Sequence, residues 1–336
     1  MSELETSEII CANPDCRIAD TGKCVEGMER DKCPHYGHAP AERNEVPEAD
    51  SGIPLSAGGT LTPVETARLL RAGEARVISV IGPSDAGKTS LIAGLYDLFQ
   101  NGPVADLAFA GSLSLHEFEH VCHDARAASR RDTPHISRTP RGEVRFYHLD
   151  LVSPTYGRLS LALGDRAGEE YRGAIDDISV VADFIEIPRA DTLTLLVDGE
   201  RLLDVGARHN LRSEIDLILQ ALIEAGAVAT RPRLAIVLTK LDVVQASADR
   251  ARTEADFAAL VANIFNTFSG SFSQIQAFRV AASPKDDSVQ RGTGVPELLT
   301  FWLESPPVPP TAAPSAQGAS RIFGRLKERE DAEATI

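Results

Sequence analysis

The sequence predicts an α/β fold in which a mostly parallel sheet is covered by helices on both faces. Across residues 76–305, short apolar runs of strand length alternate with longer segments that carry apolar residues at helical spacing. The first run, Val77–Ile81, leads through a glycine-containing octet into a helical segment, Ser90–Phe99. We therefore expect one such domain of about 230 residues, with appendages at both ends.

The elements of this domain can be assigned in chain order. Before the first strand, Thr62 and Pro63 open a short helix through Leu70, because Thr caps a helix well and Pro is tolerated in its first turn. Periodicity predicts further strands over 143–151, 192–197, 234–238 and 275–280, and helices over 210–225 and 254–268. We expect a Cys-rich head over 1–40, a linker with the short helix over 41–75, and a disordered Pro/Ala-rich tail over 306–336.

The octet at residues 82–89 reads Gly-Pro-Ser-Asp-Ala-Gly-Lys-Thr, which is the spacing of a phosphate-binding loop. Glycine lets the backbone N–H groups curl around an anion, and the following helix adds its N-terminal N–H groups. Lys88 would reach the β- and γ-phosphates, and the Thr89 hydroxyl would bind Mg²⁺. The nucleotide contacts expected from this region are Gly82, Ser84, Asp85, Ala86, Gly87, Lys88, Thr89 and Ser90.

Two later stretches indicate which base is bound. Thr239-Lys240-Leu241-Asp242 follows the apolar run 234–238 and resembles the guanine-reading motif of P-loop GTPases. A carboxylate at Asp242 can accept from both N1–H and the 2-amino group of guanine, and Lys240 would lay its aliphatic stem along the base. Val280-Ala281-Ala282-Ser283 resembles the last base-contact element, which would place Ala282 and Ser283 near the guanine O6.

Between these stretches, Asp165-Arg166-Ala167-Gly168 resembles the second Mg²⁺ and γ-phosphate element of GTPases. In that resemblance Asp165 holds Mg²⁺ through a water, and the Gly168 N–H bonds the γ-phosphate until hydrolysis releases it. The first switch should supply a Thr that binds Mg²⁺. Thr133 and Thr139 are the candidates, and Thr139 lies nearer the following strand.

Two residues depart from the pattern of small GTPases or extend it. Glu169 occupies the place where Gln orients the attacking water, so the sequence predicts either slow hydrolysis or another group that positions the water. Together with Lys88, Thr139 and Gly168, Glu169 completes the expected catalytic set. Asp85 would coordinate K⁺ beside the phosphates as in cation-dependent GTPases, or would simply cap its own loop.

Four of the five cysteines precede residue 34: Cys11, Cys16, Cys24 and Cys33. Residues 1–10 are acidic, without the basic end and apolar core of a signal peptide, so we expect a cytoplasmic protein with a structural Zn²⁺ site rather than disulfides. His35 or His38 could replace a cysteine ligand, and reduced cysteines without metal are the alternative. The fifth, Cys122, is expected to be a small buried residue, and His116, His120 and His123 are expected to lie on a surface helix.

A Cys-rich head joined to a GTPase-like domain resembles the bacterial double-GTPase family of the TRAFAC class. The resemblance rests on the head over 11–38, the region 109–139 and the motifs above. It implies a GTPase that uses GTP, GDP and Mg²⁺, in systems of biological conflict such as anti-phage defence. It also implies protein partners that read the switch loops or the zinc head, and a homodimer of the kind common in related GTPases.

Net charge and hydropathy further restrict the classes of partner that the sequence predicts. The net charge of −15 disfavours nonspecific binding to nucleic acid, and no apolar stretch approaches the roughly 18 residues of a membrane span. Three functions remain: a GTP-hydrolysing switch, a GTP-binding adaptor without efficient turnover, and an ATPase in which Thr-Lys-x-Asp is fortuitous. Glu169 is the feature that favours the adaptor.

Overall fold

The computed structural model describes residues 32–33, 36, 58–125, 142–154, 157–284 and 288–304. The chain divides into two compact units, Met1–Leu55 and Ser56–Ile336, and all the elements described below belong to the second unit. The predicted tail over 306–336 and most of the predicted head lie outside the described residues.

The described strands form one sheet in the order β2-β3-β4-β1-β5-β6-β7. The five strands from β4 to β7 in this order run parallel, whereas β3 is antiparallel to β4, and β2 is antiparallel to β3. The prediction of a mostly parallel sheet is therefore confirmed. The strands are β1 (Ala75–Ile81), β2 (Ala108–Gly111), β3 (Arg145–Ser153), β4 (Gly157–Asp165), β5 (Thr192–Asp198), β6 (Arg233–Thr239) and β7 (Ile275–Arg279).

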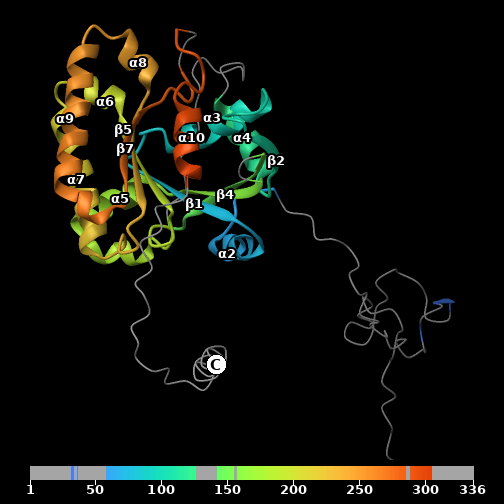
Figure 1. Ribbon diagram of the computed structural model, residues 1–336. Helices are drawn as coiled ribbons and strands as arrows, with labels where there is room; N and C mark the ends of the chain where they lie inside the picture. The colour runs from blue at the N-terminus through green and yellow to red at the C-terminus, as the bar shows by residue number, and fades with distance from the viewer. Residues whose placement is uncertain are drawn as a thin grey trace, which may run out of the picture. The chain divides into compact units, whose positions relative to one another are not determined.

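Helices cover both faces of the sheet. Figure 1 shows α7 and α9 side by side against one face, and α3, α4 and α10 against the other. Helices and 3-10 turns of the described chain are α2 (Pro63–Ala72), α3 (Lys88–Gln100), α4 (Leu115–Ala125), α5 (Gly168–Asp176), η2 (Ile178–Asp183), α6 (Gly199–Leu203), α7 (Arg208–Glu224), α8 (Leu241–Ala246), α9 (Arg250–Phe268), η3 (Ser269–Ser271) and α10 (Val295–Leu303). None of the helices in these ranges is long and apolar enough to cross a membrane.

The central strands β5 and β6 are buried along their whole length because successive side chains enter two different cores. In β5, Leu195 and Val197 pack with α5, α7 and α9, whereas Leu196 packs with α3 and α10. β6 follows the same alternation, with Ile236 on the first face and Val237 on the second. Burial on both faces is why these runs are mostly apolar and could be interpreted as strands of a covered parallel sheet.

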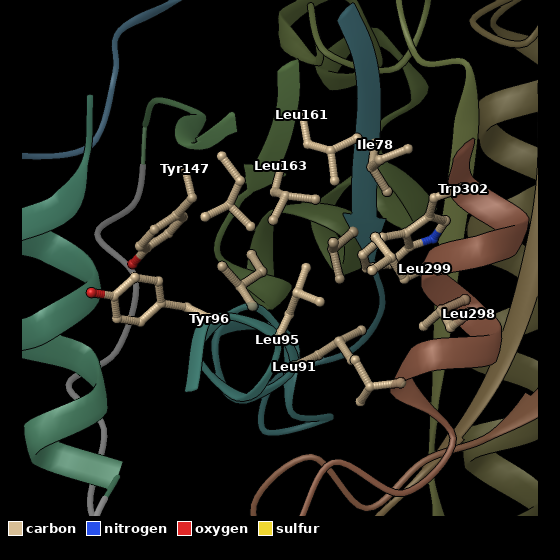
Figure 2. Packing of buried hydrophobic residues seen from close by; sticks show 14 of the residues in the cluster. Ile78, Leu91, Leu95, Tyr96, Tyr147, Leu161, Leu163, Leu298, Leu299 and Trp302 are labelled. Carbon is tan, nitrogen blue, oxygen red and sulfur yellow. The ribbon is translucent and has the colours of Figure 1, made fainter. Parts of the chain in front are cut away.

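The core between the sheet and α10 fixes the position of α3. Figure 2 shows Leu91 and Leu95 of α3 between the strand residues Ile78 and Leu163 and the helix α10, which contributes Trp302. The indole N–H of Trp302 donates to the Thr194 hydroxyl over 2.9 Å. Since α3 begins at Lys88, this packing also fixes the loop that precedes it.

The short helix before β1 forms as predicted and extends two residues further, to Ala72. Thr62 and Glu65 form a reciprocal capping box, in which each side chain accepts a hydrogen bond from the other residue's backbone N–H. The other predicted helices also differ only at their ends. In contrast, the sequence did not predict β2, α5, η2, α6, α8, η3 or α10.

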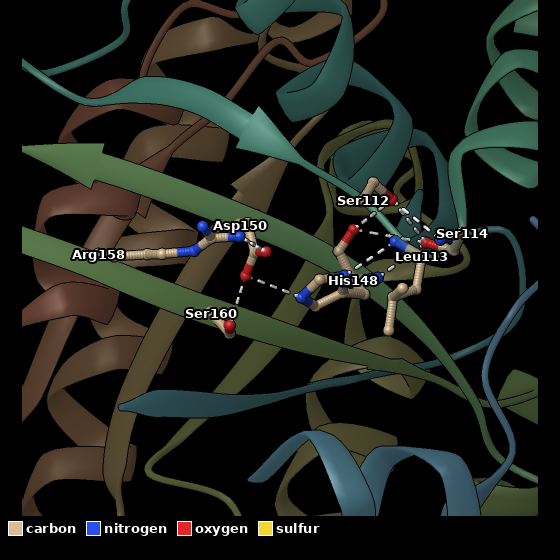
Figure 3. Close-up of polar contacts among 7 residues, drawn as sticks. All are labelled: Ser112, Leu113, Ser114, His148, Asp150, Arg158 and Ser160. Carbon is tan, nitrogen blue, oxygen red and sulfur yellow. Dashed lines mark hydrogen bonds and ion pairs between the residues drawn. The ribbon is translucent and has the colours of Figure 1, made fainter. Parts of the chain in front are cut away.

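A buried polar cluster attaches the segment after β2 to β3. His148 of β3 is 1% exposed, and its Nδ1 accepts from the backbone N–H of Leu113 over 2.9 Å. The proton of the neutral ring therefore lies on Nε2, which is 3.2 Å from Oδ1 of Asp150. Asp150 also accepts from Ser160 and from Arg158 (Figure 3). Burial lowers the pKa of His148, and the attraction of Asp150 only partly opposes it.

This cluster predicts a loss of stability in mild acid. The pKa of an unfolded His is about 6.5, whereas native His148 takes a proton only at lower pH. The unfolded state therefore binds more protons below about pH 6.5, and the free energy of unfolding falls as the pH drops toward the native pKa. Denaturant unfolding between pH 7.5 and 5.5 measures this slope.

The variant His148→Asn keeps an acceptor for Leu113 N–H and has no ionisable ring, so its slope in this pH range should be flatter. His120→Asn removes an exposed histidine of α4 and should keep the slope of the wild type. Equal slopes for wild type and His148→Asn would contradict the prediction.

Candidate nucleotide-binding site

The octet forms a tight loop between β1 and α3 in which glycine is required at two positions. Gly82 has φ 147°, and a Cβ there would lie 3.0 Å from the carbonyl oxygen of Leu196 in β5. Gly87 has φ 91°, in the left-handed region, immediately before the first turn of α3. Asp85 also has a positive φ, 61°, which is uncommon for a residue with a side chain. The loop thus has the strand–loop–helix context that a phosphate cradle needs.

Lys88 is folded back over this loop. Lys88 is 6% exposed, and its ammonium donates to the carbonyls of Gly82 (3.1 Å) and Pro83 (3.0 Å). An ammonium has three N–H donors, so the third N–H would donate a hydrogen bond to a phosphate oxygen. Burial lowers the pKa of Lys88, and the nearby carboxylates of Asp165, Glu169 and Asp85 oppose this shift.

Thr89 and Asp165 meet at the side of the loop. The Thr89 hydroxyl, in the first turn of α3, donates to Oδ2 of Asp165 over 2.8 Å. Asp165 ends β4 and is 1% exposed, and strand pairing places it beside Val80 of β1. A hydroxyl and a carboxylate are the oxygen ligands that Mg²⁺ prefers, so these two residues fit the ion that the sequence predicts here.

Gly168 lies directly against the phosphate loop at the start of α5. A Cβ on Gly168 would come within 2.4 Å of Ser84 N and 2.5 Å of the Pro83 carbonyl carbon. Both are backbone atoms, so any side chain would have to displace the loop. The Gly168 position in the predicted Asp-x-x-Gly element is therefore sterically reserved for glycine.

The second residue of that element is anchored in the core. Arg166 is 1% exposed, and its guanidinium donates to both carboxylate oxygens of Glu186 (2.8 and 3.0 Å) and to Glu170 (2.6 Å). It also donates to the Asp183 carbonyl and lies 4.8 Å from the centroid of the Phe184 ring. The Asp165–Gly168 loop is thus tied to the segment that follows α5.

The predicted base-reading residues lie at the ends of β6 and β7. The Thr239 hydroxyl donates to the carbonyl of Ala86 in the phosphate loop (2.8 Å), and also lies 3.2 Å from the carbonyl of Val197. Asp242 lies in the first turn of α8 and is 6% exposed. The Leu241 N–H donates to the Val280 carbonyl over 3.2 Å, which joins this loop to the end of β7.

The last predicted element packs against α3. A Cβ on Gly94 would lie 2.9 Å from the carbonyl oxygen of Ala282, so the two backbones are in close contact. Ala281 bridges to Thr293, and Ser283 is half-buried in the same loop. The structure therefore brings the predicted residues of β1, β4, β6 and β7 together at the carboxyl ends of the parallel strands, where ligands bind in open α/β sheets.

A cavity of about 460 Å³ lies on the α5 and α6 side of the phosphate loop. Its lining is strongly charged and reaches from the phosphate loop to Lys240 of the predicted base-reading motif, but it includes neither Asp242 nor Ala282. The lining residues are Ser84, Asp85, Gly168, Glu169, Arg172, Asp198, Glu200, Arg201, Asp204, Ala207, Glu214 and Lys240.

Several predicted site residues lie outside the described residues. These are both candidate switch threonines and most of the predicted zinc ligands: Thr133, Thr139, Cys11, Cys16, Cys24, His35 and His38. Cys33 is described and half-buried. The described ranges contain no group of three or more His, Cys, Asp or Glu residues that could hold a metal ion. The zinc site therefore stays a prediction.

The smaller predictions about the region before β3 are confirmed. His116, His120 and His123 are exposed on α4, and Cys122 is buried, with its thiol directed at the carbonyl of Ala93.

Sequence reasoning missed Asp198 and Glu200, whose carboxylates lie 2.9 and 3.1 Å from the ammonium of Lys240. A signal for Asp198 was present, because it directly follows the predicted strand over 192–197 and so belongs to the same carboxyl edge. No comparable signal pointed to Glu186, which lies 20 residues from its partner Arg166.

A family model described as Double-GTPase 2 matches residues 76–303. The chain belongs to the Double-GTPase 2 family. Membership supports GTP binding, and this family match spans all four predicted motifs. Among solved structures, the chain is similar to the signal recognition particle receptor SRb-GTP/SRX complex from Chaetomium thermophilum, with a TM-score of 0.36 and 14% identity over 68% of this chain and 95% of that chain. No curated protein matches the chain.

The contact at Gly168 leads to a prediction about nucleotide affinity. In Gly168→Ala the added methyl meets the backbone of Pro83 and Ser84, so the two loops must separate. We expect affinity for a GTP analogue to fall about tenfold or more, with a smaller loss for GDP, because the Gly168 N–H is predicted to bond the γ-phosphate, which GDP lacks. Titration with fluorescent analogues of both nucleotides measures the ratio.

Gly173→Ala is the matched control in the same helix. Nothing lies within 4 Å of a Cβ at Gly173, so this variant should bind like wild type and gain roughly 0.5–1 kcal/mol of stability. Equal GTP affinity in Gly168→Ala and Gly173→Ala would show that the close contact between Gly168 and the phosphate loop does not affect nucleotide binding.

Proposed function

We propose that this Double-GTPase 2 family member hydrolyses GTP to GDP and phosphate and acts as a molecular switch. The observation that carries the proposal is the convergence of a phosphate loop, a Thr89–Asp165 pair and a guanine-reading motif at one edge of the sheet, with Thr239 bonded directly to Ala86. Bound nucleotide would lie with its phosphates over Lys88 and its base beside Asp242. An ATPase would not need a carboxylate at the base end.

In this proposal Mg²⁺ is held by Thr89 directly and by Asp165 through water. When bound, the ion would neutralise charge that develops on the phosphates. The chain itself would contribute the ammonium of Lys88, the backbone N–H groups of the loop and the N–H of Gly168. The first-switch threonine, Thr139 or Thr133, would complete the set.

Glu169 is the residue on which turnover depends. It follows Gly168, lines the cavity beside Ser84 and Asp85, and contributes negative charge near Lys88. A carboxylate there repels the γ-phosphate and cannot donate a hydrogen bond to it, so we propose that intrinsic hydrolysis is slow. The same feature supports the second candidate function, a GTP-binding adaptor without turnover.

The wider role is also a proposal. The head and its four cysteines support a zinc-stapled interaction surface, and the double-GTPase resemblance supports a cytoplasmic role in a bacterial conflict system with protein partners, as a homodimer across the nucleotide sites. Asp85, with its positive φ beside the phosphates, remains our candidate for a K⁺ ligand.

Base specificity is tested by Asp242→Asn. Asn has a single acceptor oxygen, so it cannot accept from both N1–H and the 2-amino group of guanine, but its amide can donate to the O2 of xanthine. Loss of a charge-assisted hydrogen bond, worth about 1.5–3 kcal/mol, should weaken GTP binding roughly 10- to 100-fold and shift preference toward XTP. Asp249→Asn, an exposed acid before α9, is the control and should leave both affinities unchanged. A wild-type preference for ATP would refute the guanine proposal.

Turnover is tested by Glu169→Gln in single-turnover cleavage of labelled GTP. Gln removes the repulsion and can orient water, so we expect cleavage at least about tenfold faster than in wild type. Glu297→Gln, on the exposed side of α10, should match the wild-type rate. GTP that binds but is cleaved by neither protein would favour the adaptor, and a slower rate in Glu169→Gln would make Glu169 itself the water-positioning group.

A further inference from the structure

Asp198 uses its two carboxylate oxygens for two different tasks. It ends β5 and is 1% exposed. Oδ1 accepts from the backbone N–H groups of Glu200 (2.9 Å) and Arg201 (3.3 Å) and so caps α6. Oδ2 faces the opposite partner, the ammonium of Lys240, at 2.9 Å. A helix cap needs only the first of these contacts, so the second calls for an explanation.

Lys240 is held at its backbone as well as at its tip. Its backbone is left-handed (φ 53°, ψ 43°), and it stands directly before α8, two residues ahead of Asp242. Strand pairing places Asp198 opposite Thr239, so the carboxylate faces the neighbouring Lys240 across the strand ends. With both ends fixed, the aliphatic stem between them has one defined course.

The ion pair is partly shielded from water, which strengthens the attraction between its two charges. The Asp198 side chain is 2% exposed and that of Lys240 is 26% exposed. Burial alone would lower the pKa of Lys240, but the contacts with Asp198 and Glu200 outweigh it and raise the pKa above its usual value. The ammonium therefore remains charged and bonded. Glu200, whose side chain is 47% exposed, adds a weaker contact at the rim.

We propose that Asp198 is a positioning residue for guanine recognition. By holding the Lys240 ammonium away from the base, it lays the lysine stem flat as the surface on which a guanine ring rests, while Asp242 reads the edge of the ring. A free lysine chain would lose rotamer entropy each time the base binds, whereas the paired chain has already lost it. The inference rests on the proposal that this site binds a guanine nucleotide.

The two tasks of Asp198 can be separated by substitution. Asp198→Asn and Asp198→Ser both keep an oxygen that can cap α6, but neither offers Lys240 a negative charge. Asp198→Ala loses both functions. If positioning is the role, Asn and Ser variants should release fluorescent GDP about tenfold faster than wild type, with thermal midpoints close to wild type. If only the cap matters, Asn and Ser should match wild type and only Ala should differ.

A double-mutant cycle with Lys240→Met gives a readout that a purely structural role would not move. Met keeps an apolar stem and lacks the ammonium, so Asp198→Asn should add no further acceleration of GDP release in that background. An undiminished effect of Asp198→Asn in the Lys240→Met protein would overturn the inference. Asp177→Asn is the control, because Asp177 caps η2 through the Ser179 N–H and is not among the residues that line the cavity, and it should behave as wild type.

The same titrations distinguish failure of the inference from failure of the function on which it rests. If wild type binds neither GDP nor GTP, the proposed function is wrong and the inference falls with it. If wild type binds GDP and Asp198→Asn releases it at the wild-type rate, only the positioning role is refuted.

Discussion

The hydrogen bond from the Thr239 hydroxyl to the Ala86 carbonyl joins the two halves of the site. It spans 153 residues of sequence and brings the end of β6 into direct contact with the phosphate loop at the end of β1. β5 lies between these strands, and the same hydroxyl is within hydrogen-bonding distance of the carbonyl of Val197 at its end. A threonine at this point therefore sets the distance between the predicted phosphate cradle and the predicted base-reading residues, which a bound nucleotide would have to match.

Around this contact, the strand ends carry buried carboxylates that each organise a neighbour. Asp165 at the end of β4 receives the Thr89 hydroxyl, and Asp198 at the end of β5 receives the Lys240 ammonium. A buried carboxylate without hydrogen bonds would be strongly unfavourable, so each one holds its partner in place. Parallel strands bring these ends to one edge, which explains why the charged residues gather there while the strand interiors are mostly apolar.

The sequence predicted the parts of the site whose chemistry is local. The octet 82–89, Asp165–Gly168 and Thr239–Asp242 each have a fixed spacing behind a recognisable strand, and the mostly parallel sheet followed from the same alternation. Contacts made by distant partners were not predictable in this way. In the sequence, Arg166 cannot be distinguished from other polar loop residues, because its partner Glu186 is recognised only in the fold. Asp198 likewise marks only the end of a strand until the fold places Lys240 beside it. β2 is four residues long and ends in glycine, too short for periodicity to indicate a strand.

The burial of Arg166 constrains how a switch can work in this chain. The residue stands between Asp165, which faces Thr89, and Gly168, which touches the phosphate loop, yet its guanidinium is bonded to Glu186, Glu170 and the Asp183 carbonyl. Separating a buried arginine from its carboxylate costs several kcal/mol, roughly 3–5 when one partner is left unpaired. Movement at Gly168 must therefore either pivot at Ala167, leaving Arg166 in place, or carry η2 and the residues up to Glu186 along with it. In the second case the nucleotide state would be displayed on the surface that carries the exposed side chains of Ile178 and Ile185, well beyond the loop that contacts the phosphate.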